Sequence, residues 1–309
     1  MSEPLQRCQD VCAILVTYHP DGELPTRLRA ISQQVAALVI VDNGSEEAEL
    51  AMLREIAVDP GVTLVLNSVN LGLARALNIG VQRATSLGYE WALLLDQDSR
   101  VEGDMVRTLC AIRDRFPDRE QLAIIGSGFR ERHRRSPKAV KFESCGEEWD
   151  EVQAVITSGS LLSVAAYALI GPFREEFFID HVDTDYCARA RANGYRILKT
   201  RRPLMSHSIG RPTQHRLLWM KKWTSNHSAD RRYYIARNYT VLLRESGRYT
   251  LGSWALISLL SCLKACKRIS FYEESKGGKI AAVFTGWWDG LHGRLGPRKT
   301  RPSRASTTA

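Results

Sequence analysis

The stretch Leu93-Leu94-Leu95-Asp96-Gln97-Asp98-Ser99, residues 93–99, joins an apolar run to two carboxylates. The apolar run, which starts at Ala92, predicts the end of a buried strand. Because side chains alternate along an extended backbone, Asp96 and Asp98 can project to the same side where the strand ends. Mg²⁺ and Mn²⁺ bind such carboxylates together with phosphate oxygens of a substrate. The stretch therefore predicts either a metal–phosphate site or an ordinary polar turn.

Strands and helices alternate through the N-terminal part of the chain, which predicts right-handed βαβ units around a parallel sheet. Buried strands are expected at 11–16, 38–41, 62–66, 91–95 and 122–125, with helices at 24–35, 47–57, 71–87 and 105–116 between them. Ligands of such sheets bind beyond the carboxyl ends of the strands. Polar residues gather at these ends: Thr17-Tyr18, Asp42-Asn43, 67–70 and Asp96-Gln97-Asp98. A nucleotide pocket is therefore expected at this edge.

Two common phosphate-binding loops are missing from the sequence. No Gly-x-Gly-x-x-Gly follows the first strand, where residues 17–22 read Thr-Tyr-His-Pro-Asp-Gly. No Gly-x-x-x-x-Gly-Lys-Ser/Thr occurs either. A metal ion on Asp96 and Asp98 is the expected substitute for a glycine loop in holding a diphosphate.

Charge is distributed unevenly along the chain. Residues 1–198 carry 21 Lys and Arg against 29 Asp and Glu, whereas residues 199–309 carry 22 against 5, a balance of +17. The basic C-terminal third predicts an anionic partner, which could be nucleic acid, lipid head groups or a phosphorylated substrate. The chain starts without a signal-peptide pattern, and its seven scattered Cys lack metal-ligand spacing. Reduced thiols and a cytoplasmic location are therefore expected.

Two apolar segments lie in the basic third. Residues 251–263 are apolar and are followed by a cluster of Lys and Arg. This segment is shorter than the about 20 residues that a membrane span requires, so it forms either a core helix or a helix at a membrane interface. Residues 280–291, with two adjacent Trp, are also typical of a membrane surface. Residues 298–309 are expected to be a disordered tail.

Two further motifs carry candidate catalytic groups. Residues 177–186 read Phe-Phe-Ile-Asp-His-Val-Asp-Thr-Asp-Tyr and place three acids near an expected helix start, where acids also favour the helix dipole. A carboxylate within reach of an acceptor hydroxyl can act as a general base. His207, in Ser206-His207-Ser208, follows an expected strand over 195–199.

Together these motifs resemble inverting family 2 glycosyltransferases of the GT-A fold, over about residues 11–210. The matching positions are Asp42-Asn-Gly-Ser45, Asn70-Leu-Gly-Leu-Ala-Arg-Ala-Leu-Asn-Ile-Gly80, Asp96-Gln-Asp-Ser99, Asp183 and His207. Four stretches look more narrowly like bacterial rhamnosyltransferases, which use dTDP-L-rhamnose: residues 93–99, 178–186, 231–238 and 288–291.

The resemblance implies a role for each matching position. Nucleotide contacts are implied for Thr17, Tyr18, Asp42, Asn70, Gly72, Arg75 and Asp96. Asp98 and His207 are implied as ligands of Mg²⁺ or Mn²⁺, with Asp96 as a further candidate, and Asp183 as the base. The Glu that precedes this base in the family is Val182 here, and Asp180 or Asp185 could replace it. Acceptor contacts are expected from Asp180, Trp219, Arg232, Tyr233 and Arg237.

The expected fold is α/β, with a mixed, mostly parallel GT-A sheet flanked by helices over 8–210, a basic and aromatic helical region over 211–297, and a tail over 298–309. The expected reaction moves L-rhamnose from a dTDP-sugar donor to a hydroxyl of a glycolipid, lipid-linked oligosaccharide or cell-surface polysaccharide. Peripheral contact with the inner face of the cytoplasmic membrane is expected, and a nucleic-acid partner is not.

Three alternatives remain open. The first is a family 2 transferase that uses another sugar nucleotide. The second is a metal-dependent nucleotidyltransferase, which would need a basic triphosphate loop that residues 17–22 do not offer. The third is a basic module that binds membrane or nucleic acid without turnover.

Overall fold

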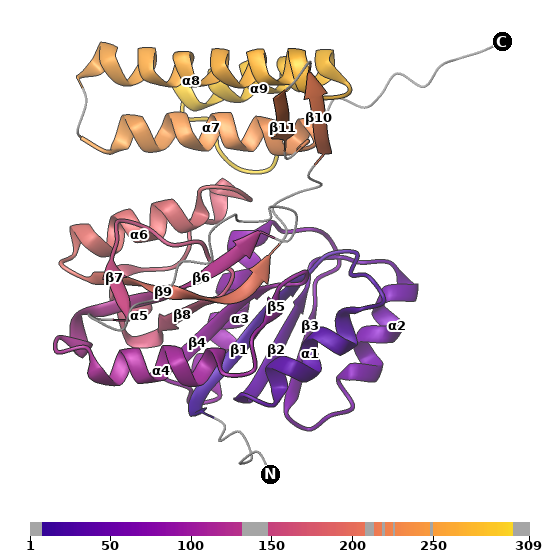
Figure 1. Cartoon of the computed structure of the whole chain (residues 1–309), viewed down its shortest axis with the longest axis vertical. Helices are drawn as coiled ribbons and strands as arrows, with labels where there is room; N and C mark the ends of the chain where they lie inside the picture. Colours follow the sequence, from indigo (N-terminus) through magenta and orange to yellow (C-terminus); the bar gives the residue numbers. More distant parts are fainter. Residues whose placement is uncertain are drawn as a thin grey trace. The chain divides into compact units, whose positions relative to one another are not determined.

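The computed structural model describes residues 8–131, 148–207, 213–217, 220–224, 226–247 and 250–298 (Figure 1). For 129–131, 207, 213–217, 220–224 and 251 it describes the backbone alone. The chain forms two compact units. Unit 1 comprises Met1–Glu175 and His181–His227, and unit 2 comprises Glu176–Asp180 and Ser228–Ala309. The expected domain boundary at 210/211 falls ahead of this division, and residues 299–309 of the expected tail lie outside the described part.

Unit 1 is built on a mixed sheet with the strand order β3-β2-β1-β4-β8-β6-β9-β5, in which β7 also pairs with β9. The strands are β1 (Cys8–Thr17), β2 (Val35–Asp42), β3 (Val62–Leu66), β4 (Trp91–Asp96), β5 (Arg100–Val101), β6 (Leu122–Glu131), β7 (Trp149–Glu151), β8 (Ser160–Ser163) and β9 (Arg196–His207). Strands β1 to β4 pair in parallel, as do β6 and β9, whereas β8, β5 and β7 pair antiparallel. The mixed sheet is confirmed, and β5, β7 and β8 are strands that the hydrophobic pattern did not predict.

Helices cover both faces of this sheet (Figure 1). They are α1 (Leu24–Ser32), α2 (Glu47–Ile56), α3 (Leu73–Ser86), α4 (Met105–Arg115), α5 (Val164–Ile170) and α6 (Val182–Ala192), with short 3-10 turns at Arg119–Gln121 and Glu175–Phe177. The odd-numbered residues Val11, Ala13 and Leu15 of β1 join the core that includes α1 and α4. The even-numbered Ile14 faces α3, where a Cβ on Gly80 would lie 2.3 Å from Ile14 Cγ2.

The strand order places a topological switch point between β1 and β4. From β1 the chain moves outward to β2 and β3 and then returns to the other side of β1 to form β4. Ligands of open α/β sheets bind in the crevice at such a point. The register aligns Thr17 with Asp42 and Val16 with Asp96, so three of the predicted polar residues end neighbouring strands within one position of each other.

Unit 2 is helical, as predicted for the C-terminal region. It contains α7 (Ala229–Glu245), α8 (Leu251–Tyr272) and α9 (Lys276–Leu291). Helices α7 and α9 approach closely at Gly286, because this residue has no Cβ. A Cβ at this position would lie 2.2 Å from the Tyr233 carbonyl oxygen. The predicted apolar segment at 251–263 is the first half of α8, which continues to Tyr272. None of the described helices is both long enough and apolar enough to span a bilayer.

A two-stranded hairpin of β10 (Thr213–Leu217) and β11 (Met220–Thr224) precedes α7 in the chain and was not predicted. Trp219, a predicted acceptor contact, comes between them in the sequence and is outside the described residues.

Candidate active site

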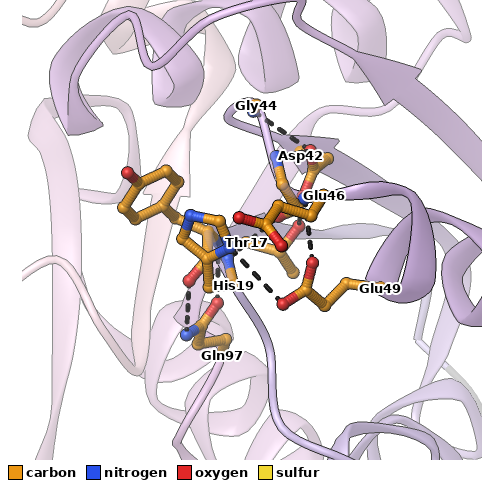
Figure 2. A network of polar contacts seen from close by, with 9 residues as sticks. Thr17, His19, Asp42, Gly44, Glu46, Glu49 and Gln97 are labelled. Atoms are coloured by element: carbon orange, nitrogen blue, oxygen red, sulfur yellow. Dashed lines mark hydrogen bonds and ion pairs between the residues drawn. The ribbon is translucent and has the colours of Figure 1, made fainter.

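The carboxylate of Asp42 organises the turn that follows β2 (Figure 2). It is fully buried, and its Oδ1 accepts hydrogen bonds from Thr17 Oγ1 at 2.9 Å and Ser45 Oγ at 2.5 Å. Its Oδ2 accepts from the backbone N–H groups of Gly44 at 3.1 Å and Ser45 at 2.8 Å. An ionised carboxylate has about four lone-pair positions, so these bonds fill it. A contact between Asp42 and a nucleotide stays a prediction and would require one of these bonds to exchange.

His19 lies beside this turn and was not among the predicted site residues. Its backbone N–H donates to Ser45 Oγ at 2.9 Å, and its Nδ1 lies 3.4 Å from Glu49 Oε1 (Figure 2). Its φ of 48° lies in the left-handed region, which costs a non-glycine residue energy. The only sequence signal for His19 was its position just after the first strand.

Gln97 joins the end of β1 to the turn that follows β4 (Figure 2). The backbone N–H of Tyr18 donates to Gln97 Oε1 at 2.8 Å, and Gln97 Nε2 donates to the Tyr18 carbonyl at 3.0 Å. The side-chain amide of Gln97 thus exchanges two hydrogen bonds with the backbone of Tyr18, as a paired residue in a β-sheet would. The central residue of Asp96-Gln97-Asp98 therefore fixes the turn from which the two carboxylates project.

Ser158 supports the same turn from the other side. Its Oγ accepts a hydrogen bond from the backbone N–H of Asp96 at 3.1 Å and lies 2.6 Å from Ser99 Oγ. The backbone N–H of Gly159 donates to the Leu94 carbonyl at 2.8 Å. The run of small residues over 157–160 thus packs directly against the end of β4.

Asp96 and Asp98 are both partly exposed, and they are the candidate metal ligands that this turn presents. Ser206 of β9 pairs with Arg100, two residues after Asp98, so the backbone of β9 brings His207 towards the turn. The His207 side chain lies outside the described part. Among the side chains that are described, no cluster of three or more His, Cys, Asp and Glu groups could hold a metal ion.

The loop before α3 is shaped by Asn43, Asn70 and Gly72. Asn43 Nδ2 donates to Asn70 Oδ1 and to the Gly72 carbonyl, both at 3.1 Å. Gly72 has a φ of 87°, which only glycine adopts easily, and it precedes the first turn of α3. Arg75 in that turn is largely exposed and lies 3.8 Å from Glu175. The predicted nucleotide residues Asn70 and Gly72 therefore fix the loop, and Arg75 offers an accessible cation.

Asp183, the predicted base, is the second residue of α6 and is partly exposed. Its Oδ1 accepts from the backbone N–H of Thr184 at 2.7 Å and from Thr184 Oγ1 at 3.2 Å. Its other oxygen, Oδ2, accepts no hydrogen bond from the residues that the structure describes. One oxygen is thus held while the other is available to a substrate proton.

The two candidate substitutes for the missing Glu have different surroundings. Asp185 is buried; Arg189 Nε donates to it at 2.9 Å, and Arg174 lies 3.8 Å away. Asp180, which belongs to unit 2, accepts from Arg231 Nε at 3.1 Å. Both carboxylates are therefore engaged in ion pairs, and the choice between them stays open.

Unit 2 buries most of the predicted acceptor contacts. Arg232 and Lys279 both bind the buried carboxylate of Glu273. Arg237 is fully buried and donates to the carbonyl oxygens of Glu176, Phe177 and Gly296. Both arginines therefore bind groups in the interior of unit 2, and an acceptor contact by either of them stays a prediction.

Tyr233 is also nearly buried within unit 2, and its hydroxyl donates to Asp289 Oδ2 at 2.8 Å. Burial, together with this hydrogen bond, raises the pKa of Tyr233 to about 12. The neutral phenol is therefore the form that unit 2 stabilises, and its single hydroxyl proton is already donated to Asp289.

Comparison with known proteins matches part of the chain to a described family. Residues 12–140 match the profile of the family described as "Glycosyl transferase family 2". The chain therefore contains a glycosyltransferase family 2 domain over residues 12–140. The chain is 28% identical over 256 residues to "dTDP-rhamnosyl transferase RfbF" of Shigella flexneri. This alignment covers 77% of the chain and 81% of the relative.

Solved structures confirm the GT-A-like fold. S. aureus TarS 1-349 in complex with UDP-GlcNAc aligns with a TM-score of 0.58 and 14% identity, over 91% of this chain and 81% of that one. The mannosyltransferase PcManGT from Pyrobaculum calidifontis, in complex with GDP-Man and Mn²⁺, aligns with a TM-score of 0.58 and 14% identity, over 93% and 88%. A longer S. aureus TarS chain aligns at 0.51, and only 44% of its length is covered. At these identities the likeness concerns the fold alone.

Proposed function

We propose that this glycosyltransferase moves L-rhamnose from dTDP-L-rhamnose to a hydroxyl of a glycolipid, a lipid-linked oligosaccharide or a cell-surface polysaccharide. The observation that carries the donor is the 28% identity to a dTDP-rhamnosyl transferase across 77% of the chain. Thr17, Asp42 and Asp96 end neighbouring strands at the switch point, and this placement supports nucleotide binding at this edge of the sheet. A family 2 transferase that uses another sugar nucleotide is the alternative.

Asp183 is proposed as the base. Its Oδ2 would accept the proton of the acceptor hydroxyl as that oxygen attacks the anomeric carbon of the donor. The bond from the anomeric carbon to the diphosphate oxygen breaks in the same step, through an oxocarbenium-like transition state. A single displacement inverts the anomeric centre, so a β-L-rhamnosyl donor gives an α-L-rhamnoside. The hydrogen bonds from Thr184 to Oδ1 support this role because they fix the carboxylate.

A divalent cation is proposed at Asp96 and Asp98, with His207 as a third ligand. Two partly exposed carboxylates on a turn held by Gln97 and Ser158 are hard oxygen donors of the type that Mg²⁺ and Mn²⁺ prefer. PcManGT and GalNAc-T7 were each solved with Mn²⁺. When bound, such an ion would neutralise charge on the leaving diphosphate.

The remaining nucleotide contacts are proposed at the rim of the same crevice. Tyr18 is exposed next to Thr17, and Arg75 projects from the first turn of α3. A guanidinium there can form charge-assisted bonds with phosphate oxygens. Asn70 and Gly72 would act by shaping the loop that precedes Arg75.

The proposal is tested by donor and acceptor panels with the full chain. Turnover of dTDP-L-rhamnose, UDP-GlcNAc and GDP-mannose is measured against a rhamnolipid and an undecaprenyl-linked acceptor. We expect the enzyme to prefer dTDP-L-rhamnose. Turnover of only one of the other donors would show that the proposed donor is wrong. Asp183→Asn should abolish transfer while dTDP still binds in calorimetry. Full activity in that variant would rule out Asp183 as the base.

A further inference from the structure

The outward side of α8 carries a stripe of exposed leucines. Leu256, Leu260 and Leu263 are 56%, 48% and 47% exposed. Their spacing of i, i+4 and i+7 places them on one side of the helix. Three half-exposed leucines in one row form a continuous apolar surface, whereas single exposed leucines on a protein surface need no explanation.

The opposite side of α8 already packs inside unit 2. Trp254, Cys262 and Ile269 are buried there, and the side chain of Trp287 in α9 donates to Ser258 Oγ at 2.9 Å. The leucine stripe is therefore a second apolar side that the fold of unit 2 does not use. A helix that is apolar on both sides requires a second apolar environment.

Cations continue this outward side towards the C-terminus of α8. Lys264, Lys267 and Arg268 are exposed beyond the leucines, and α8 contains no acidic residue from Leu251 to Tyr272. Phe271, 61% exposed, lies on the same side. Leucines bordered by Lys and Arg are typical of helices that lie in the plane of an anionic membrane surface.

The charges around the leucine stripe argue against a second copy of the chain as the partner that covers it. A symmetric dimer would bring each cluster of Lys264, Lys267 and Arg268 towards the same cluster of its partner or leave it without an opposite charge. The C-terminal third, with 22 Lys and Arg against 5 Asp and Glu, offers little acidic surface to compensate. Anionic lipid head groups supply the missing charge.

We propose that the α8 face, formed by Leu256, Leu260, Leu263, Lys264, Lys267 and Arg268, docks on an anionic phospholipid surface. The leucines enter the boundary between head groups and acyl chains, and the three cations contact lipid phosphates. At 22 residues, α8 is about 33 Å long and lies parallel to the surface. Helix α9 adds two exposed aromatics, Phe284 and Trp288, a residue type enriched at membrane interfaces.

The leucines are tested by vesicle flotation of the full chain. The triple variant Leu256→Gln, Leu260→Gln, Leu263→Gln keeps good helix formers and should lower the partition coefficient on phosphatidylglycerol-containing vesicles by about 100-fold. A matched control replaces three exposed apolar residues of unit 1: Val58→Gln, Leu87→Gln and Leu169→Gln. The control should bind within about twofold of the wild type, and circular dichroism checks that both variants fold. Equal binding by the leucine variant and the wild type would overturn the proposal.

The cations are tested by charge removal. Lys264→Gln, Lys267→Gln and Arg268→Gln together should lower binding to phosphatidylglycerol vesicles by at least about tenfold and should weaken its salt dependence. Pure phosphatidylcholine vesicles should bind wild type and variant equally weakly. An undiminished affinity for anionic vesicles would contradict the proposed lipid-phosphate contacts.

Two further measurements distinguish membrane docking from dimer formation and from an effect on catalysis. A wild-type dimer in light scattering that the leucine substitutions turn into a monomer would show that the α8 face joins two copies, and would overturn the proposal. Donor turnover with a water-soluble acceptor should stay at the wild-type level in the leucine variant, because none of these residues belongs to the proposed active site. Vesicle binding is measured without donor, so it can fail or succeed independently of the proposed rhamnosyl transfer.

Discussion

Replacing Asn238 by Ala should destabilise unit 2 by about 2–3 kcal/mol. Asn238 is fully buried in α7, and its Nδ2 donates to the carbonyl oxygens of Phe177, Ile179 and Asp180 at 3.0, 2.9 and 2.9 Å. An amide NH₂ has two hydrogens, so the three carbonyls share them. One side chain thus holds the whole Glu176–Asp180 segment within unit 2.

The magnitude follows from what the carbonyls retain after the change. The Phe177 carbonyl keeps a donor, Arg237, at 3.1 Å. The carbonyls of Ile179 and Asp180 lose Nδ2, and each loss costs about 1 kcal/mol because both residues are half-buried and water can partly replace the bond. Loss of the packed side chain adds roughly another 1 kcal/mol.

Because the backbone near residues 178–181 is strained, the same substitution should also change hydrogen exchange in this segment. Phe178 and Asp180 both have a φ of 63°, and His181 has a φ of 61°. Each left-handed non-glycine residue costs about 1–2 kcal/mol and persists only where the surrounding structure holds it. Without the amide the segment can relax, so its backbone N–H groups should exchange with solvent faster.

The assay combines urea unfolding by circular dichroism with hydrogen exchange at residues 177–181. Because the chain forms two compact units, a single two-state transition is not assumed, and the unfolding free energy is taken from the transition of unit 2. Asn193→Ala is the control: Asn193 is exposed in unit 1, and its Nδ2 donates to one carbonyl, that of Arg189, at 2.8 Å. This change should leave the transition of unit 2 unaltered and lower the unfolding free energy of unit 1 by under about 0.5 kcal/mol. Asn238→Asp keeps the shape of the side chain but places a carboxylate oxygen, which accepts hydrogen bonds, against three carbonyl oxygens that also accept. This change should lower the unfolding free energy of unit 2 more than Asn238→Ala. Unchanged stability and exchange in both Asn238 variants would refute the reasoning.

Three further changes test other parts of the structure. Gln97→Leu removes both bonds to the main chain at the end of β1 and should lower kcat/KM for the donor by about 10–100-fold, measured as nucleotide release; an unaltered value would mean that the carboxylate turn does not depend on Gln97. Gly80→Ala would place a Cβ 2.3 Å from Ile14 and should cost about 1–3 kcal/mol in thermal unfolding, whereas Gly22→Ala, with open space around it, should not destabilise in this way. The pKa of Tyr233 is raised to about 12, above the value of about 10 in an unfolded chain, so its neutral form stabilises the fold below about pH 10 and this contribution is lost as pH rises towards 12. The unfolding free energy of wild type minus Tyr233→Phe should therefore shrink by about 1–2 kcal/mol over that range, and a constant difference would contradict the assignment.

Local sequence pattern predicted the half of unit 1 that consists of consecutive βαβ units. Apolar runs of the right length located β1, β2, β3 and β4, and the polar residues after them identified Thr17, Asp42 and Asp96 as strand ends. These features depend on side-chain periodicity and on the handedness of parallel connections, which neighbouring residues encode. The antiparallel strand β8 was missed because Ser160–Ser163 is short and has no alternation of its own.

The contacts that support the site came only from the tertiary structure. Gln97 meets Tyr18 across 79 positions of sequence and Ser158 meets Asp96 across 62, and no local pattern records such pairings. Burial is likewise a property of packing: the sequence could not show that Arg237, a predicted acceptor contact, lies fully inside unit 2. In α8, apolar residues occur on both sides of the helix, so periodicity could not say which side faces the core. The packing of Trp254 and Ile269 decided that question and left Leu256, Leu260 and Leu263 facing outward.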